Sequence, residues 1–318
     1  MQGPMEGSQR EETMKNRNYV LGLLVVVLVS ISTAVRAQAP EPQKLSFTFH
    51  DAKISGALEV DSYWINNRGW ISGDYILSDG TWHGMKCKLA KSGSCTNVKT
   101  IDDPNGTHTT GQGINTAGDM VGYYVNSAGN YQGFLYKGGT FTDISGPEGS
   151  IGSLAIGIND KGLIVGWYQD SAGVWHGFLY DGTTYTDLTV PGASATYAQA
   201  INNKNWIVLV VVNSSGLYDS YLTTNKGNSY NPIDVPGAAQ SWVNDINNAG
   251  NRVYTIYDSQ GVRHGDLYYG GKYTQFDDPK GTNTRGDAVN DSLVIVGRYG
   301  SGPSGGNGGY GYEAVVKK

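Results

Sequence analysis

Four residues of this 318-residue sequence could serve as acids or bases in catalysis: Glu148, Asp245, Asp287 and His108. Each lies in a segment that differs between otherwise similar stretches of the chain. Glycoside hydrolysis needs two carboxyl groups about 5 to 9 Å apart, and such a pair could come from these residues if the fold brought them to one central face. A hydrolase of glycosidase or lactonase type is therefore one hypothesis.

The same variable segments carry side chains suited to binding. Trp64, Tyr197 and Trp242 could each stack on the face of a sugar ring, and Arg285 could fix a polar group of a ligand. We predict these four as ligand-binding residues. Because no unique nucleophile, acid or base accompanies them, the leading hypothesis is a module that binds a carbohydrate, a cell-envelope component or another protein without catalysis.

Other motifs that could carry chemistry have a structural interpretation. The segment 300–306 satisfies both G-x-G-x-x-G and G-x-S-x-G, but it lacks the strand, turn and helix that these motifs require, so 301–309 is predicted as an enlarged turn. His83, His176 and His264 occupy equivalent places in a repeat, too far apart to share a metal ion, and we expect them to tie neighbouring strands together. The sequence predicts no metal site and no cofactor.

The segments around these residues belong to a unit that the chain repeats six times, at intervals of 43 to 49 residues. An Ile-Asn or Val-Asn pair marks each unit, at 65–66, 114–115, 158–159, 201–202, 246–247 and 289–290. A small residue opens a later apolar stretch, at Gly84, Gly133, Gly177, Ser220, Gly265 and Gly311. A proline ends the unit at 104, 147, 191, 236 and 279. The three markers keep the same order throughout.

Turn residues divide each unit into four short strands. Asn-x-x-Gly follows the first strand in four units, Asn205 replaces the glycine in the fourth unit, and both residue types accept positive φ. The asparagines of the marker pairs are interpreted as turn formers. Leu293 occupies the glycine position in the sixth unit, which predicts a different turn there.

Four strands in about 43 residues are typical of a β-propeller blade, so the chain is predicted to be all-β, with six four-stranded blades. The sixth unit stops after its third strand, whereas residues 45–51 form an isolated strand before the first unit. We expect this N-terminal strand to complete the last blade and close the ring. The predicted propeller spans residues 45–318.

Units such as GINDKGLIVG (157–166), followed by WHGF (175–178) and DVPG (234–237), resemble the bacterial extracellular HAF repeat. Kelch-like propeller repeats are a looser likeness. The resemblance covers about residues 45–316 and implies export and a repeated β architecture, but no established activity. This chain departs from the pattern by carrying Gly in place of the family's Ala.

The N-terminus predicts export from a bacterial cell. Residues 19–35 form an apolar run after Lys15 and Arg17, and a small-residue cleavage pattern ends at Ala37. We assign 1–37 as a signal peptide and 38–44 as a linker, with translation starting at Met1 or at Met14. An uncleaved segment would act as a membrane anchor. In an exported protein Cys87 and Cys95 are expected to form a disulfide.

Composition agrees with a secreted β protein that does not bind nucleic acid. Glycine accounts for 46 residues and tyrosine for 22, whereas charged residues make up only 16%. The 23 basic and 28 acidic residues give a net charge of -5 without a basic block, so a nucleic-acid backbone has no complementary surface.

Overall fold

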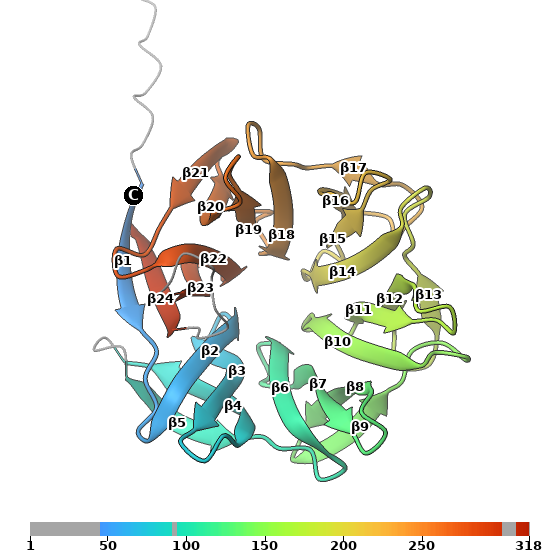
Figure 1. Cartoon of the computed structure of the whole chain (residues 1–318), viewed down its shortest axis with the longest axis horizontal. Helices are drawn as coiled ribbons and strands as arrows, with labels where there is room; N and C mark the ends of the chain where they lie inside the picture. The colour runs from blue at the N-terminus through green and yellow to red at the C-terminus, as the bar shows by residue number, and fades with distance from the viewer. Residues whose placement is uncertain (1–44, 91–93, 301–309, 318) are drawn as a thin grey trace, which may run out of the picture. The chain divides into compact units, whose positions relative to one another are not determined.

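The computed structural model describes residues 45–317 except 91–93 and 301–309, and these residues form six antiparallel blades around a central axis (Figure 1). In blade 1 the strands are β2 (Ala57–Ile65), β3 (Trp70–Leu77), β4 (Trp82–Leu89) and β5 (Cys95–Thr100). Blade 2 contains β6 (Gly106–Ile114), β7 (Met120–Asn126), β8 (Tyr131–Lys137) and β9 (Thr140–Ile144). Blade 3 contains β10 (Gly152–Ile158), β11 (Ile164–Gln169), β12 (Trp175–Tyr180) and β13 (Tyr185–Asp187).

The second half of the chain repeats this arrangement. Blade 4 contains β14 (Ala195–Ile201), β15 (Ile207–Val212), β16 (Tyr218–Thr223) and β17 (Asn231–Pro232). Blade 5 contains β18 (Gln240–Ile246), β19 (Arg252–Tyr257), β20 (Arg263–Tyr269) and β21 (Lys272–Phe276). Blade 6 contains β22 (Thr282–Val289), β23 (Val294–Gly300), β24 (Tyr310–Lys317) and β1 (Ser46–Asp51). The predicted six-bladed, four-stranded propeller is therefore confirmed.

The two ends of the described chain share blade 6. Strand β1 pairs antiparallel with β24 along its whole length, from Ser46 opposite Lys317 to Asp51 opposite Tyr312. The ring of Phe47 stacks on Phe276 of blade 5 at 4.8 Å, and Phe49 meets the edge of Tyr312 at 5.2 Å. The prediction that the N-terminal strand closes the ring is thus confirmed, and the closure leaves blade 6 as complete as the other five.

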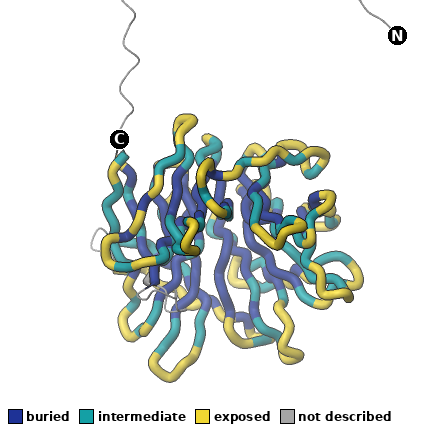
Figure 2. Tube along the Cα trace, turned by 45° about the horizontal axis from the view of Figure 1, so that its top comes forward, coloured by how far each residue is buried: buried dark blue, intermediate teal, exposed yellow. Residues whose placement is uncertain are grey.

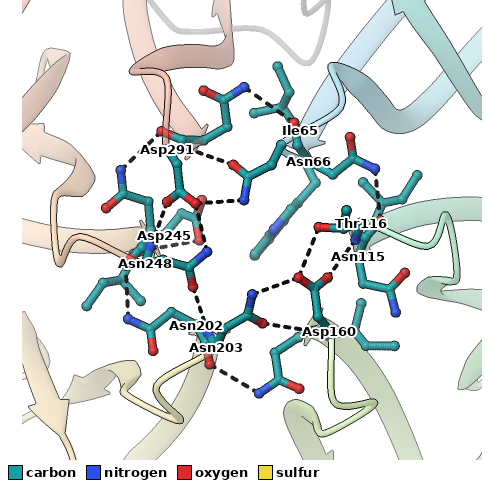
Figure 3. A pocket seen from close by; sticks show the side chains of 18 of the residues that line it. Ile65, Asn66, Asn115, Thr116, Asp160, Asn202, Asn203, Asp245, Asn248 and Asp291 are labelled. Carbon is teal, nitrogen blue, oxygen red and sulfur yellow. Dashed lines mark hydrogen bonds between the residues drawn. The ribbon is translucent and has the colours of Figure 1, made fainter.

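The asparagines of the marker pairs connect the blades as well as forming turns. Asn247 accepts hydrogen bonds at Oδ1 from the amides of Ala249 and Asn251 in its own turn, both at 3.0 Å. Its Nδ2 donates to the carbonyl of Asn290 in the next blade at 3.1 Å. Equivalent links run from Asn66, Asn159, Asn202 and Asn290 to the blade that follows each of them. These five links follow one mouth of the channel (Figure 3), whereas Asn115 donates to Asp119 in its own turn.

The turn at Leu293 corrects one sequence-based expectation. We expected leucine to impose a different turn, but Leu293 has a φ of 60°, like Asn205 at 62°. Its amide donates to the carbonyl of Asn290 at 3.1 Å, as in the other five turns. Leucine is tolerated in this unfavourable region because its side chain is only 3% exposed and packs in the core between blades 5 and 6.

The small residue of the third strand lets successive blades pack closely. A Cβ atom at Gly311 would lie 2.7 Å from the carbonyl oxygen of Val60 and 2.7 Å from Ser62 Oγ, both in the first strand of the next blade. Larger side chains are excluded at this position by the neighbouring backbone. Apolar residues of adjacent blades fill the remaining space, so the buried residues follow the inner strands of every blade (Figure 2).

The predicted disulfide is confirmed. Cys87 in β4 and Cys95 at the start of β5 are bonded, with Cα atoms 5.6 Å apart, so the bond joins the two outer strands of blade 1. The assigned signal peptide (1–37), the linker (38–44) and the turn at 301–309 lie outside the described residues. In the part of the chain that the structure describes, no helix is long and apolar enough to span a membrane.

Candidate functional site

Each inner strand carries a β-bulge at the same place, and these bulges build the candidate site. The pairing between first and second strands shifts by a residue two positions before the marker Ile or Val of every unit. A bulge releases one residue from the ladder and redirects its side chain. The six residues at this position all line a single pocket in the central channel: Tyr63, Gln112, Ile156, Gln199, Asn244 and Asp287.

The pocket has a volume of about 280 Å³, at the lower end of small-molecule sites. Two residues before each bulge a second set of side chains contributes Leu154, Trp242 and Arg285 to the wall. Second strands add Tyr123, Trp167, Thr255, Tyr257 and Arg298, and Trp64 completes the lining. The wall therefore combines aromatic rings with side-chain amides, and its charged groups all come from blade 6.

Arg298 is the centre of a buried ionic cluster at the junction of blades 6 and 1. Its Nε donates to Asp287 Oδ2 at 2.9 Å and its Nη2 to Asp287 Oδ1 at 3.4 Å. Its Nη1 donates to the hydroxyl of Tyr63 at 3.1 Å and lies 3.7 Å from Asp61 Oδ2. Burial alone would lower the pKa of Arg298, but Asp287, Tyr63 and Asp61 raise it well above its ordinary value. Arg298 thus remains charged and fixes both carboxylates.

Asp61 in this cluster and the nearby Asp74 are poorly solvated. Burial and the charge of Asp287 raise the pKa of Asp61, although Arg298 partly opposes the shift. Burial and the charge of Asp61 raise the pKa of Asp74 to about 8. Asp74 is only 1% exposed and does not line the pocket. Its protonation state therefore affects the stability of the fold, and its side chain does not contact a ligand in the pocket.

Arg285 lies directly opposite Arg298 in the β22–β23 pairing. Burial, followed by the charge of Arg298, lowers the pKa of Arg285 to about 10. Whereas Arg298 is held by two carboxylates, Arg285 forms no salt bridge with any residue that the structure describes. Its guanidinium is the positive charge of the pocket wall that no carboxylate pairs within the described residues.

The structure brings most of the predicted ligand-binding residues together. Trp64, Trp242 and Arg285 line the central pocket. Tyr197 lies behind the wall, where its ring stacks on Trp242 at 5.6 Å and meets the edge of Trp167 at 4.8 Å. Tyr197 therefore supports the aromatic wall rather than forming it.

The four predicted catalytic candidates do not converge. Asp287 lines the pocket and is paired with Arg298. Asp245 is buried near the opposite mouth, where it accepts hydrogen bonds from the amides of Ile246 at 2.7 Å and Val289 at 2.9 Å. Glu148 is exposed in the loop between β9 and β10, and His108 packs beside Trp82 near the outside of blade 2, with ring centres 5.9 Å apart. No two of these carboxylates share the pocket.

Sequence reasoning did not single out the amides Gln112, Gln199 and Asn244, which the bulges direct into the channel. A signal was present, because these residues stand two positions before the marker Ile in each repeat. That position varies while its neighbours recur, which is typical of a functional position on a repeated scaffold. Because a bulge shifts the alternation of side chains along a strand, the sequence pattern alone does not show which residues before the marker Ile point into the channel.

The opposite mouth is occupied by the asparagine ring, where Thr116, Asp160, Asn203, Asn248 and Asp291 form a second set of inter-blade hydrogen bonds (Figure 3). The opening there has a volume of about 70 Å³, and its polar groups bind one another. The recurrent histidines also have structural partners, as expected: His83 bonds to Asp102, His176 to Asp170 and His264 to Asp277. The candidate site is therefore the bulge-lined pocket.

A further pocket of about 340 Å³ lies between blades 1 and 2, lined by residues that include Trp82, His83 and His108. The backbone of His108 has a φ of 53°, an unfavourable value for a residue other than glycine. His83 is held by Asp102 and Thr81, so its ring is already bonded on both nitrogens. This outer pocket contains one of the four catalytic candidates and no carboxylate pair.

Fold and pocket together define a six-bladed propeller with a small, mixed aromatic and polar central site. The sequence matches no protein-family model, and no curated protein matches it. Its structure is similar to a putative TolB from Agrobacterium tumefaciens, with a TM-score of 0.56 and 14% identity over 86% of this chain and 99% of that one. Trypanosoma rangeli sialidase gives 0.51 and 10% identity over 87% of this chain and 60% of that one.

A lectin from Aleuria aurantia in complex with a fucosyl-GlcNAc ligand has a TM-score of 0.47 and 12% identity, covering 82% of this chain and 97% of the lectin. At these identities the two similarities with TM-scores above 0.5 support the propeller fold and show nothing about the ligand.

Proposed function

We propose that this protein is an exported binding module that holds a carbohydrate in the central pocket, without catalysing a reaction. The observation that carries the proposal is the combination of aromatic rings and side-chain amides in the bulge-lined wall. Trp242 and Tyr257 offer flat apolar faces, and Gln112 offers both a donor and an acceptor. The amide nitrogen of Asn244 already donates to Thr255 and Gly286, so Asn244 offers its acceptor oxygen. Sugar rings present the complementary pattern of apolar C–H faces edged by hydroxyl groups.

Export is part of the same proposal and rests on different observations. The Cys87–Cys95 disulfide is of a kind that persists in oxidising compartments outside the cytosol. The apolar segment before Ala37 and the likeness to extracellular HAF repeats agree with it. The ligand would then be a glycan of the cell envelope or of the surroundings.

Binding is favoured over hydrolysis because Asp287, the one carboxylate among the described residues that lines the pocket, is already paired with Arg298. Both oxygens of Asp287 accept hydrogen bonds from Arg298, and this pairing opposes the proton uptake or nucleophilic attack that a glycosidase carboxylate performs. The hydrolase alternative predicts turnover of chromogenic glycosides, esters or lactones that disappears in Asp287→Asn.

The test is a glycan array probed with the full-length chain, followed by calorimetric titration of each hit. Trp242→Ala should weaken binding by about tenfold or more, since it removes a ring that contacts the ligand. Trp206→Ala is the matched control, because Trp206 is similarly half-buried but lies in the turn after β14, outside the central pocket. The proposal would be overturned if no glycan on the array bound, or if a folded Trp242→Ala variant bound its glycan with unchanged affinity.

A further inference from the structure

The polar groups of the central pocket are not balanced between donors and acceptors. On the blade 6 side, Asp287 is neutralised by Arg298, which also bonds to Tyr63. That leaves Arg285 as a positive charge without a carboxylate partner among the described residues. A partly buried charge without a salt-bridge partner is costly. Burial and the charge of Arg298 lower the pKa of Arg285, and the charge of Asp287 opposes the shift only in part.

Two further donors in the same wall lack protein partners. The side-chain nitrogen of Gln199 is buried and makes no hydrogen bond within the described residues, and Gln199 is only 7% exposed. The indole nitrogen of Trp167 is likewise buried without a partner there. Both residues line the pocket. A buried donor left unpaired costs about 1 to 3 kcal/mol, which a ligand acceptor would recover.

All three unsatisfied groups therefore require acceptors, and one of them requires a negative charge. A carboxylate is an acceptor without a donor, and it pairs with a guanidinium through two parallel hydrogen bonds. The hydroxyl and ring oxygens of a sugar supply the weaker acceptors that the amide of Gln199 and the indole of Trp167 need.

We propose that the central pocket recognises an acidic saccharide of the uronic acid class, whose carboxylate pairs with Arg285. The inference rests on the proposed carbohydrate-binding function and narrows it to one class of ligand. Arg285 is then the residue that determines specificity, while the aromatic wall supplies affinity that neutral sugars share. Arg298 is not available for this role, because Asp287 and Asp61 already neutralise it.

The experiment compares matched acidic and neutral probes on the full-length chain. Oligogalacturonate, oligomannuronate and a glucuronate-terminated oligosaccharide are each titrated beside their methyl esters, which keep the sugar skeleton and lose the charge. At least one acid should bind about tenfold or more tightly than its ester, and added salt should reduce this difference.

Three variants test the assignment to Arg285. Arg285→Gln should lower the affinity for the acid to that of the ester and leave the ester's affinity unchanged, whereas Arg285→Lys should retain part of the preference. Arg68→Gln is the control, since Arg68 is exposed in the turn after β2 at the other mouth. Equal affinity for acid and ester, or a preference that survives Arg285→Gln, would overturn the acidic ligand and leave carbohydrate binding standing. Failure of every saccharide on the array would overturn both.

Discussion

Three buried aspartates have pKa values far above the ordinary value of an aspartate carboxyl group. Burial raises the pKa of Asp74 to about 8, and it raises those of Asp245 and Asp266 to about 7. In each case burial is the largest cause, and for Asp74 the charge of Asp61 adds to it. These side chains are therefore tolerated in the blades mainly as neutral acids, and deprotonation inside the fold works against stability.

The pH dependence of stability follows from Asp74. Its folded pKa of about 8 exceeds the unfolded value of 3.8, so the native state binds the extra proton between these limits. Stability should therefore fall as pH rises, by about 1.4 kcal/mol per pH unit from this one group. Asp74→Asn should remove that contribution, so its free energy of unfolding, measured in urea at pH 5 and pH 7, should differ less than that of the wild type.

Glu148→Gln makes the same chemical change on an exposed loop and should leave the wild-type slope intact. If Asp74→Asn kept the full slope, the assignment of the proton to Asp74 would be wrong.

At the scale of elements, two kinds of turn use asparagine differently. In turns between second and third strands the side-chain oxygen accepts hydrogen bonds from its own turn, as when Asn126 accepts from the amides of Ala128 and Asn130. Where such an asparagine also donates, as Asn213 does to Asp219, the bond stays within its own blade. Aspartate does the same at Asp170 and Asp258, so the two residue types interchange there. After the first strand all six repeats have asparagine, because most of these side chains must also donate to the next blade.

A matched pair of substitutions tests this distinction. Asn247→Asp keeps the acceptor for its own turn and loses the donor to the carbonyl of Asn290, so we expect a loss of about 1 to 3 kcal/mol in unfolding free energy. Asn126→Asp changes an acceptor-only turn and should cost almost nothing. Chemical denaturation of both variants provides the comparison, and equal losses would mean that the inter-blade link contributes nothing.

Repetition allowed most of the fold to be predicted and only part of the site. Marker residues with a fixed role, such as the small residue Gly311, recur in every copy and can be counted. The turn at Leu293 was misjudged because burial outweighed backbone preference, which no local pattern reveals. Gln112 and Gln199 were missed because a bulge, a feature of pairing between strands, directs them into the channel. Trp242 and Arg285 were found because aromatic and charged residues stand out in variable segments.

For the molecule as a whole, stability depends on closing the ring. Strand β1 covers β24 and places Phe47 against Phe276 of the neighbouring blade. Without it, blade 6 would expose a strand edge and part of the core that it shares with blade 5. The disulfide, by contrast, joins two strands within blade 1 across only eight positions of sequence.

These two features should differ sharply in their effect on unfolding. Deleting residues 45–51 should abolish a single cooperative thermal transition, since one of six blades is left incomplete. Cys87→Ser should cost on the order of 2 to 3 kcal/mol and keep the transition cooperative, because a short closed loop restricts the unfolded chain only modestly. Calorimetry of both variants decides the matter; a deletion variant that melted like the wild type would contradict the role given to β1.

The five inter-blade links from the marker asparagines run in one rotational sense, each amide reaching from its own blade to the following one. The link from Asn290 to Asn66 crosses the junction of the termini like the rest. In these links the boundary between blades 6 and 1 resembles the other junctions, although a parallel bridge between β2 and β24 is added there. New termini cut into the β9–β10 loop, with the old ones joined by a linker, would preserve every one of these contacts. The protein should therefore tolerate circular permutation, which would allow a fusion partner to be attached at another blade of the propeller.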